Sequence, residues 1–473
     1  MSENSEHKTK TILRSIPDGA MWTRLDGFGM ACSGEGWRLK VRSEEDVVEM
    51  FRAVKSTDLK VAFRGAGVSY GDAAINQKEL ICDCSEMNNI LDWDPVTGII
   101  HLEGGVTVEQ IWRHVIGDGY WPPVVSGTMA PTVAGALAMN IHGKNCFVKG
   151  PIGDHVLGMR VVTPKGEALD CSPDENTELF ESVISSFGSL GFISSARIQL
   201  TKVHSGRISV RAFCTSDLSE MFRCFAKNID DSDYLVGWID GFKRGSALGR
   251  GIVHSASYLK EGEDPRAGHY LEAKAHELPT RLFKVIPKKW MWRLVKPFAN
   301  RLGMRMINAL KYRMSWLFDR GRAHLETLGG FNFLLDYIPD WRNIYKPGGF
   351  IQHQSFLPKE SAEDGFRRIL EICHAHRIPP FLAVFKRHKP DRFRLTHGLD
   401  GFSLALDLPI RSYSRGRILE MTAEIDALVC SLGGRFYPAK DATVRAEHYR
   451  SSIPPEDLDR FIALKERLDP ETR

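Results

Sequence analysis

Residues 126–145 read SGTMAPTVAGALAMNIHGKN, an apolar, helix-like run that begins with small residues and ends in a polar tail. Small side chains allow a backbone to approach a flat or extended ligand closely, and the N–H groups at a helix start favour phosphate. The polar tail then presents three side chains within four positions: His142, Lys144 and Asn145. The stretch predicts a ligand-binding segment, and the rest of the chain has to indicate the ligand.

A second glycine-rich stretch, FRGAGVSYGD at 63–72, follows a predicted strand. Closely spaced glycines let successive N–H groups turn toward one point, which makes a nest for a diphosphate. The stretch is neither a Walker loop nor a complete G-x-G-x-x-G/A fingerprint with an acidic partner. Alone, it would be an ordinary tight turn. A third cluster, FGSLGFISS at 187–195, could close over the same ligand.

Composition limits the class of protein. The 473 residues are 43% hydrophobic and 26% charged, with a net charge of +4, which is typical of a soluble globular protein and shows no overall nucleic-acid signature. This length predicts two domains. Nine scattered cysteines, with Cys82 and Cys84 lacking a second pair, favour reduced thiols over a zinc site.

Compartment is predicted from what the sequence does not contain. The start, MSENSEHKTK, is polar and has no apolar h-region, so we expect no signal peptide. No window approaches the roughly 20 apolar residues of a membrane span. We therefore expect a cytoplasmic location.

The pattern of hydrophobic residues predicts an α+β protein. Up to about residue 203, strands alternate with helices, including a helix over 44–56, a helix from Val106 and two strands around the turn at 164–166. After that, strand–helix–strand units recur. Their predicted parts are strands at 207–214, 234–242, 348–358, 379–388 and 401–410, helices at 216–229 and 361–378 (capped by Ser361), and a last helix through Cys430. These predict two similar halves on one antiparallel sheet.

Residues 281–322 have an unusual composition. They hold twelve Lys or Arg and one acid, Asp319, interleaved with Trp and Phe. A basic amphipathic helix with aromatic residues on its apolar side is typical of a membrane surface. A helical lid that packs on its own domain would explain the segment as well. Both interpretations stay open from the sequence.

Six stretches together carry a family resemblance: RGAGVSYGD, SGT with TVAGALAMNIHGKN, GDHVLGMRVVTPKGE, GFIQHQSFLP, AVFK and FYPAKD. Over residues 40–470 the chain resembles FAD-linked oxidases of the vanillyl-alcohol oxidase type, and among them the decaprenylphosphoryl-β-D-ribose 2-oxidases. The resemblance implies a two-subdomain PCMH-type FAD-binding domain at 20–206, completed by 435–473. It also implies an α+β substrate domain at 207–434, with a helix-covered antiparallel sheet and the basic insert 281–322.

The same resemblance implies an FAD site. Family members with covalently attached flavin often have His where this chain has Val68, so the FAD here is expected to be non-covalent. The residues that match the family's FAD contacts are Arg64, Gly65, Ala66, Gly67, Val68, Ser69, Tyr70, Gly71, Asp72, Ala73, Ala74, Gly127, Thr132, Val133, Ala134, Gly135, Met139, Asn140, Ile141, His142, Ile193 and Tyr437.

Oxidising a secondary alcohol requires that a hydride reach the flavin and that a proton leave the hydroxyl. The resemblance implies Lys440 beside the flavin, held by Asp441, with Tyr70 and His142 relaying the proton. Four residues are expected to hold sugar hydroxyls and phosphate: Lys144, Gln352, Gln354 and Lys386. Each has a simpler interpretation, such as a solvated strand face for the two glutamines.

The expected reaction is oxidation of the 2-hydroxyl of a polyprenyl-phosphoryl ribose to a keto sugar, on the way to the arabinose epimer. This implies a short-chain dehydrogenase as reductase partner, an electron acceptor such as oxygen or a quinone, and peripheral contact with the inner face of the membrane. Mycobacterial members read Asn-x-Cys-x-Asp where this chain has Ser403, Ala405 and Asp407, which leaves the sugar open. The alternatives are a soluble sugar-alcohol or aldonolactone oxidase, a flavin-dependent double-bond reductase, and a flavin-free scaffold.

Overall fold

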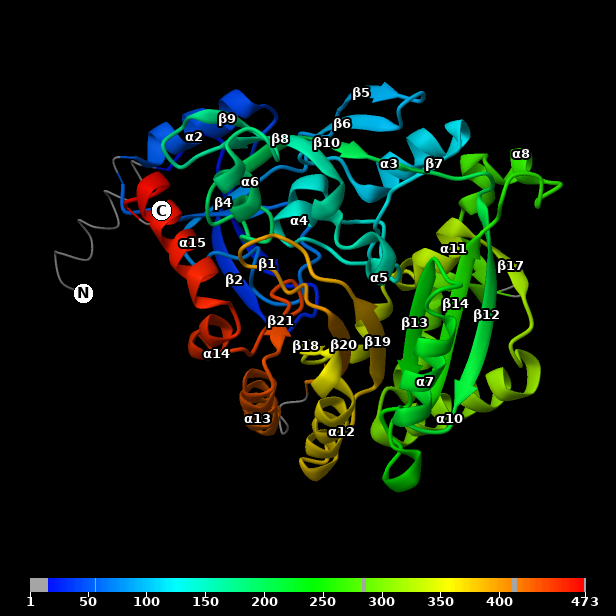
Figure 1. Ribbon diagram of the computed structural model, residues 1–473. Coiled ribbons are helices and arrows are strands. Elements are labelled where there is room, and N and C mark those ends of the chain that lie inside the picture. Colours follow the sequence, from blue (N-terminus) through cyan, green and yellow to red (C-terminus); the bar gives the residue numbers. More distant parts are fainter. Residues whose placement is uncertain (1–15, 56, 283–285, 411–414, 472–473) are drawn as a thin grey trace.

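The computed structural model describes residues 16–55, 57–282, 286–410 and 415–471 (Figure 1). The polar start at 1–10, on which the expectation about a signal peptide rests, lies outside the described residues. So do residues 283–285 of the basic segment.

The N-terminal part contains two main sheets. One has the order β1 (Met21–Asp26), β2 (Ser33–Lys40), β4 (Leu80–Asp83), β3 (Val61–Arg64), with β2, β4 and β3 parallel. The other is antiparallel, with the order β5 (Ile90–Asp94), β6 (Ile99–Glu103), β10 (Phe192–Gln199), β8 (Val156–Val162), β9 (Ala168–Cys171). A short ladder joins β7 (Tyr120–Trp121) to β11 (Thr201–Lys202).

Five helices accompany these sheets: α2 (Glu44–Val54), α3 (Val108–Val115), α4 (Val133–Ala138), α5 (Cys146–Lys149) and α6 (Thr177–Val183). The predicted helix at 44–56 is confirmed as α2, which begins after Ser43 because the Ser43 side chain accepts a hydrogen bond from the N–H of Asp46. The helix predicted from Val106 begins at Val108 instead, since Thr107 and Gln110 form a capping box there.

The C-terminal part is built on one eight-stranded sheet. Its order is β17 (His324–Thr327), β12 (Arg207–Thr215), β14 (Gly251–Tyr258), β13 (Tyr234–Ile239), β19 (Leu382–His388), β20 (Gly401–Pro409), β18 (Phe350–Pro358), β21 (Arg435–Phe436). All its paired strands are antiparallel. The two halves meet where β13 pairs with β19, which confirms the prediction of two halves on one sheet.

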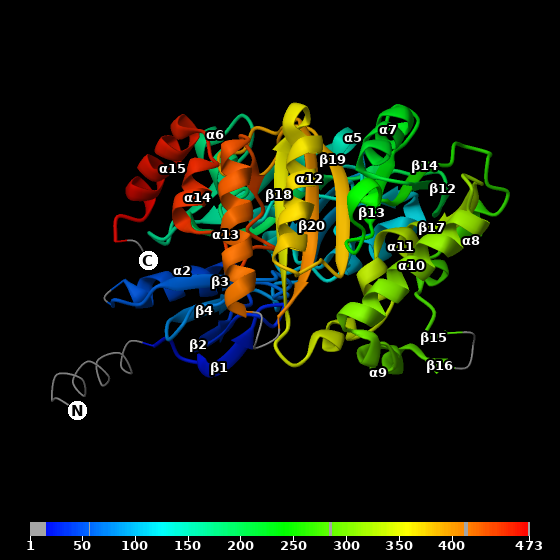
Figure 2. The same cartoon turned by 90° about the horizontal axis from the view of Figure 1, so that it is seen from below.

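Three long helices cover one face of this sheet: α7 (Leu218–Asn228), α12 (Lys359–Ala375) and α13 (Arg415–Ser431) (Figure 2). The predicted cap at Ser361 is wrong. Helix α12 begins two residues earlier, at Lys359, and the Ser361 hydroxyl donates back to the carbonyl of Pro358. A serine hydroxyl inside a helix can bond the preceding turn, so Ser361 does not mark the start.

The remaining elements are α8 (Ala267–Tyr270), α9 (Met291–Val295), α10 (Arg301–Phe318), α11 (Leu328–Asn332), α14 (Ala446–Ser451), α15 (Pro455–Leu468) and the pair β15 (Arg281–Leu282) and β16 (Ile286–Pro287). Among the described residues, no helix combines the length and the apolar character needed to cross a bilayer.

The chain returns to its N-terminal part at the end. The apolar core that spans residues 41–200 also includes Tyr437, Phe461 and Leu464. In both views α15 lies beside the N-terminal elements (Figures 1 and 2). A second core fills the space between the large sheet and its covering helices. The residue boundaries of the two domains stay a prediction.

Candidate active site

A deep cavity lies where the glycine-rich loops face the large sheet. Its empty space, including the open mouth, is about 1230 Å³. Most of the residues predicted to contact a cofactor line it: Arg64, Gly65, Ala66, Gly67, Val68, Ser69, Tyr70, Ala73, Ala74, Gly127, Thr132, Ala134, Gly135, Met139, Ile141, His142, Ile193 and Tyr437. The third glycine cluster also contributes to the wall, through Phe187, Gly188 and Gly191.

Four residues of the predicted cofactor set are not in the wall. Gly71 packs against Asp441, whose carbonyl oxygen would overlap a side chain at that position. Val133 belongs to the apolar core, and Asp72 is exposed. The Asn140 side chain is buried and accepts a hydrogen bond from the N–H of Gly153, 3.0 Å away.

The first two glycine-rich stretches meet at one point of the wall. A methyl group added at Gly65 would overlap the hydroxyl of Thr132. Thr132 is itself the cap of α4, since its hydroxyl accepts from the N–H of Gly135 at 3.3 Å. Only a residue without Cβ allows this approach, so Gly65 is required by the contact between two distant loops.

Sequence reasoning missed several wall residues: Phe28, Cys84, Pro131, Leu335 and Ala439. They are apolar or small, and they come from loops far apart in the chain. No local pattern distinguishes them from core residues, so only the tertiary structure identifies them.

Lys440, Tyr70, His142 and Lys386 line the cavity together. The Lys440 Nζ atom lies 5.9 Å from the centroid of the Tyr70 ring. Burial and the nearby Lys386 cation lower the pKa of Lys440 to about 7, while the Asp407 carboxylate opposes this shift. Near neutral pH, Lys440 can therefore both hold and release a proton.

His142 lies between two polar side chains. The Lys386 Nζ atom is 3.4 Å from its Nδ1 atom, and the Gln354 Nε2 atom is 3.1 Å from its Nε2 atom. Burial, and then the Lys386 charge, lower the pKa of His142 well below its usual value. His142 is therefore neutral at physiological pH, with one donor and one acceptor nitrogen.

Of the four residues predicted to bind substrate, only Lys386 lines the cavity. Lys144 donates to the carbonyl of Phe331, and Gln352 donates to Asp407. Gln354 donates to Ser403, 3.0 Å away. Both glutamines are buried, which rules out the solvated face that the sequence left open. They support the residues of the wall from behind.

The comparisons with known proteins agree with this geometry. Residues 38–172 match the family described as FAD binding domain. The chain contains a PCMH-type FAD-binding domain. It is also 29% identical, over 95% of each chain, to decaprenylphosphoryl-beta-D-ribose oxidase of Mycolicibacterium smegmatis. The protein is thus an FAD-dependent oxidoreductase, similar to an oxidase that is named for decaprenylphosphoryl-β-D-ribose.

Two more distant relatives match parts of the chain. Putative D-arabinono-1,4-lactone oxidase of Neurospora crassa is 22% identical over 35% of this chain and 30% of its own. Cytokinin dehydrogenase 3 of Oryza sativa is 26% identical over 71% of this chain and 65% of its own. These relatives act on different substrates, as their names state, so the FAD-binding domain alone does not decide the substrate.

The cavity of the FAD-binding domain suits FAD in shape and chemistry. Its wall at 65–69 and at Thr132, Ala134 and Gly135 carries mostly small side chains, which leave room for a flat, extended dinucleotide. Arg64 holds the first loop by donating to the carbonyl of Ala74 at 3.0 Å. When bound, FAD would supply the hydride acceptor in the cavity that Lys440, Lys386 and His142 also line.

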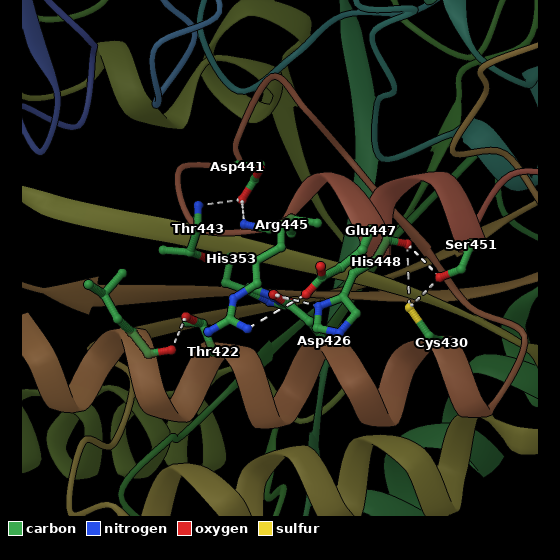
Figure 3. Close-up of polar contacts among 12 residues, drawn as sticks. His353, Thr422, Asp426, Cys430, Asp441, Thr443, Arg445, Glu447, His448 and Ser451 are labelled. Atoms are coloured by element: carbon green, nitrogen blue, oxygen red, sulfur yellow. Dashed lines mark hydrogen bonds and ion pairs between the residues drawn. The ribbon is translucent and has the colours of Figure 1, made fainter.

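Asp441 does not hold Lys440, as the sequence had led us to expect. Asp441 does not act on Lys440 as the neighbouring carboxylate, since Asp407 is the acid that raises the pKa of Lys440. Instead, one Asp441 oxygen accepts from the backbone N–H groups of Thr443 (2.7 Å) and Val444 (2.9 Å), as Figure 3 shows. Asp441 therefore holds the turn that follows Lys440.

Among the described residues, one group of side chains has the composition of a metal site: His142, Cys146 and His388. Their possible ligand atoms lie within 4.8 Å of one another. Burial raises the pKa of Cys146 to about 12, so its thiol keeps its proton. The Cys146 sulfur accepts from the N–H of Gly143, and the Lys386 cation nearby disfavours a second cation. These side chains support the wall of the cavity.

Proposed function

We propose that the protein oxidises the 2-hydroxyl of a polyprenyl-phosphoryl ribose to a 2-keto sugar. The observation that carries the proposal is the pair of half-buried lysines, Lys386 and Lys440, in the cavity wall beside the neutral His142. Burial lowers the pKa of Lys386 to about 8. Two partly protonated lysines in one buried site favour an anionic, phosphorylated substrate.

In this proposal each side chain has a defined task. FAD, held between the glycine-rich loops, would supply the hydride acceptor for the C2 hydrogen. The neutral form of Lys440 takes the proton of the substrate hydroxyl. Tyr70 packs beside Lys440 and limits where the sugar can lie. Lys386 stabilises the developing oxyanion and the phosphate. Burial raises the pKa of Tyr70 well above its usual value, so its hydroxyl can donate a hydrogen bond but does not ionise.

The product would be a ketone, and its reduction from the opposite face would yield the arabinose epimer. We therefore propose a short-chain dehydrogenase as the partner that consumes this product for arabinan and cell-wall synthesis. All nine cysteines are unpaired, which supports a reducing, cytoplasmic compartment.

A second candidate, an aldonolactone oxidase, is favoured by the partial similarity to D-arabinono-1,4-lactone oxidase. Anaerobic bleaching of the flavin band near 450 nm would distinguish the two. Polyprenyl-phosphoryl ribose in detergent should bleach the holoenzyme, while free pentitols and aldonolactones should not. Lys386→Met should raise the substrate concentration needed for half-maximal bleaching at least ~10-fold. Bleaching by the free polyols alone would reject the proposal.

A further inference from the structure

Helix α10 presents a row of apolar side chains to solvent. The residues at every fourth position, Leu302, Met306, Leu310 and Met314, are 69%, 59%, 62% and 47% exposed. Residues four apart lie on one face of a helix. A helix at the surface of a soluble domain normally turns charged and polar side chains outward. The outward face of α10 therefore lacks the polar character expected of a solvated face.

The opposite face of α10 already packs on the protein. Met304 packs against the aromatic cluster that contains Tyr70, and Tyr312 packs against the cluster of Trp238. Between them, the Asn308 amide donates to the carbonyl of Phe381, 3.4 Å away. These inward contacts are the ones that a helical lid would make when it packs on its own domain. They leave the exposed row without a partner among the described residues.

The apolar row continues into the neighbouring turns. The further exposed apolar side chains here are Trp290, Leu294, Phe298, Trp316, Leu317 and Phe318. We call these residues, together with the row on α10, the α9–α10 surface. Figure 2 shows α9 and α10 together at one edge of the molecule, beside β15 and β16. Contiguous exposed apolar surface of this kind marks an interaction site.

The charge of the α9–α10 surface favours an anionic lipid bilayer over other partners. Residues 287–322 contain ten Lys or Arg and one acid, Asp319, which accepts a hydrogen bond from Ser315. Arg301 and Arg305 occupy the first turns of α10, where positive charge opposes the helix dipole. The stability of α10 therefore does not explain why arginines occupy these two positions. Basic residues beside Leu, Met and Trp are complementary to anionic headgroups above acyl chains.

The α9–α10 surface also adjoins the wall of the cavity. Phe28, which lines the cavity, has its ring centroid 6.2 Å from that of Trp341. Trp341 begins the 3₁₀ turn Trp341–Tyr345, against which α9 packs. On the other side, Met304 of α10 shares a cluster with Tyr70. A ligand held at this surface would be close to the cavity.

We propose that the α9–α10 surface docks the protein on an anionic lipid bilayer, with its apolar row among the acyl chains and its arginines at the headgroups. The proposal does not depend on which sugar is oxidised. It predicts that affinity requires both the apolar row and the basic residues, and that salt weakens binding because exposed charges are screened.

Flotation of the holoenzyme with vesicles tests the proposal. One set of vesicles contains phosphatidylglycerol and phosphatidylcholine, and the other contains phosphatidylcholine alone. The apolar variant is Leu302→Ser, Met306→Ser, Leu310→Ser, and the charge variant is Arg301→Gln, Arg305→Gln, Arg313→Gln. Matched controls place the same changes on exposed residues elsewhere: Met21→Ser, Leu91→Ser, Val96→Ser and Lys165→Gln, Arg223→Gln, Lys227→Gln.

The wild type should bind the anionic vesicles and detach at high salt. The charge variant should bind about 100-fold more weakly, and the apolar variant at least ~10-fold more weakly, while both controls bind like the wild type. An unchanged 450 nm flavin band would show that the variants are folded. Failure of the wild type to bind, or equal binding by the apolar variant, would overturn the proposal. So would a wild-type dimer that the apolar variant converts to monomer without any vesicle binding.

Discussion

The imidazole of His353 and the carboxylate of Asp426 form a buried pair, with Nε2 2.7 Å from Oδ1 (Figure 3). The pair lies on the helix-covered face of the large sheet. Because side chains alternate along β18, His353 points away from its neighbours Gln352 and Gln354, which support the cavity. The loop with Asp441 packs near this pair and contributes to its charge environment.

Asp426→Asn should destabilise the protein in a pH-dependent way. Burial alone would lower the pKa of His353, but the hydrogen bond and charge of Asp426 raise it above the usual value. The pair therefore contributes fully below about pH 6.5 and loses its contribution as the pH rises through the raised pKa. We expect Asp426→Asn to lower the free energy of unfolding by about 3 kcal/mol at pH 5.5, and by less at pH 9. Urea titration at the two pH values measures the loss.

The matched control is Glu424→Gln, which breaks the surface pair between Glu424 and His376 at 2.9 Å. An exposed pair contributes about 1 kcal/mol or less. Equal losses for Asp426→Asn at both pH values would contradict a charged His353.

Lys440→Ala should slow flavin reduction by substrate ~10²–10⁴-fold, which is the usual effect of removing a general acid or base. The FAD content should be unchanged, since Lys440 is one of many residues in the cavity wall. Stopped-flow absorbance at 450 nm measures the rate. Lys389→Ala, a partly exposed lysine 3.9 Å from Asp154, is the control and should have no effect. Unchanged reduction in Lys440→Ala would remove Lys440 from the reaction.

The rate of flavin reduction should rise with pH and level off above about pH 7, the pKa to which burial lowers Lys440. Asp407 raises this pKa through its charge, so Asp407→Asn should move the rising limb to lower pH. Rates measured from pH 5 to 9 for both proteins check the direction. A shift to higher pH would mean that a different group titrates.

Gly65→Ala should lower FAD affinity at least ~10-fold, because the added methyl group overlaps the Thr132 hydroxyl and separates the two loops. Fluorescence titration of the apoprotein with FAD measures the change. Gly65→Ala combined with Thr132→Gly should recover part of the affinity. Gly117→Ala is the control, since a Cβ at Gly117 meets nothing within 4 Å. Full affinity in Gly65→Ala would show that this contact is not needed.

Acid precipitation should release the yellow cofactor into the supernatant. Val68 lines the cavity at the position where the family resemblance implies that members with attached flavin often have His, and valine offers no nucleophile for a covalent bond. A protein with covalently bound flavin, precipitated in parallel, should keep its colour in the pellet. Colour retained in the pellet of this protein would refute non-covalent binding.

Local patterns predicted much of the fold. The stretch at 44–56 has an acidic first turn and apolar residues at helical spacing, and it forms α2 with Val47, Met50 and Phe51 buried. The turn at 164–166 separates β8 from β9 as expected. Such features depend on neighbours within a few residues, which the sequence displays directly. The position of Ser361 shows the limit, since one hydroxyl can either cap a helix or bond the preceding turn.

The candidate site was predicted most completely where small residues bring the backbone close to the ligand. Residues 65–69, Thr132, Ala134 and Gly135 line the cavity, where their mostly small side chains bring backbone close to a ligand. Long polar side chains were harder to predict, because their direction depends on distant partners. Lys144 donates to Phe331 and Gln352 donates to Asp407, and neither partner is near in sequence.

By itself, the sequence determined that this protein has three glycine-rich stretches, an α+β architecture and a basic, apolar segment at 281–322, while the family resemblance implied the FAD. These follow from residue type and short spacing. Only the tertiary structure decided that Asp407 is the acid that raises the pKa of Lys440, and that α10 turns an apolar row outward while Met304 packs inward. The physical reason is that electrostatic shifts and burial depend on distances between residues far apart in the chain, which no local pattern contains.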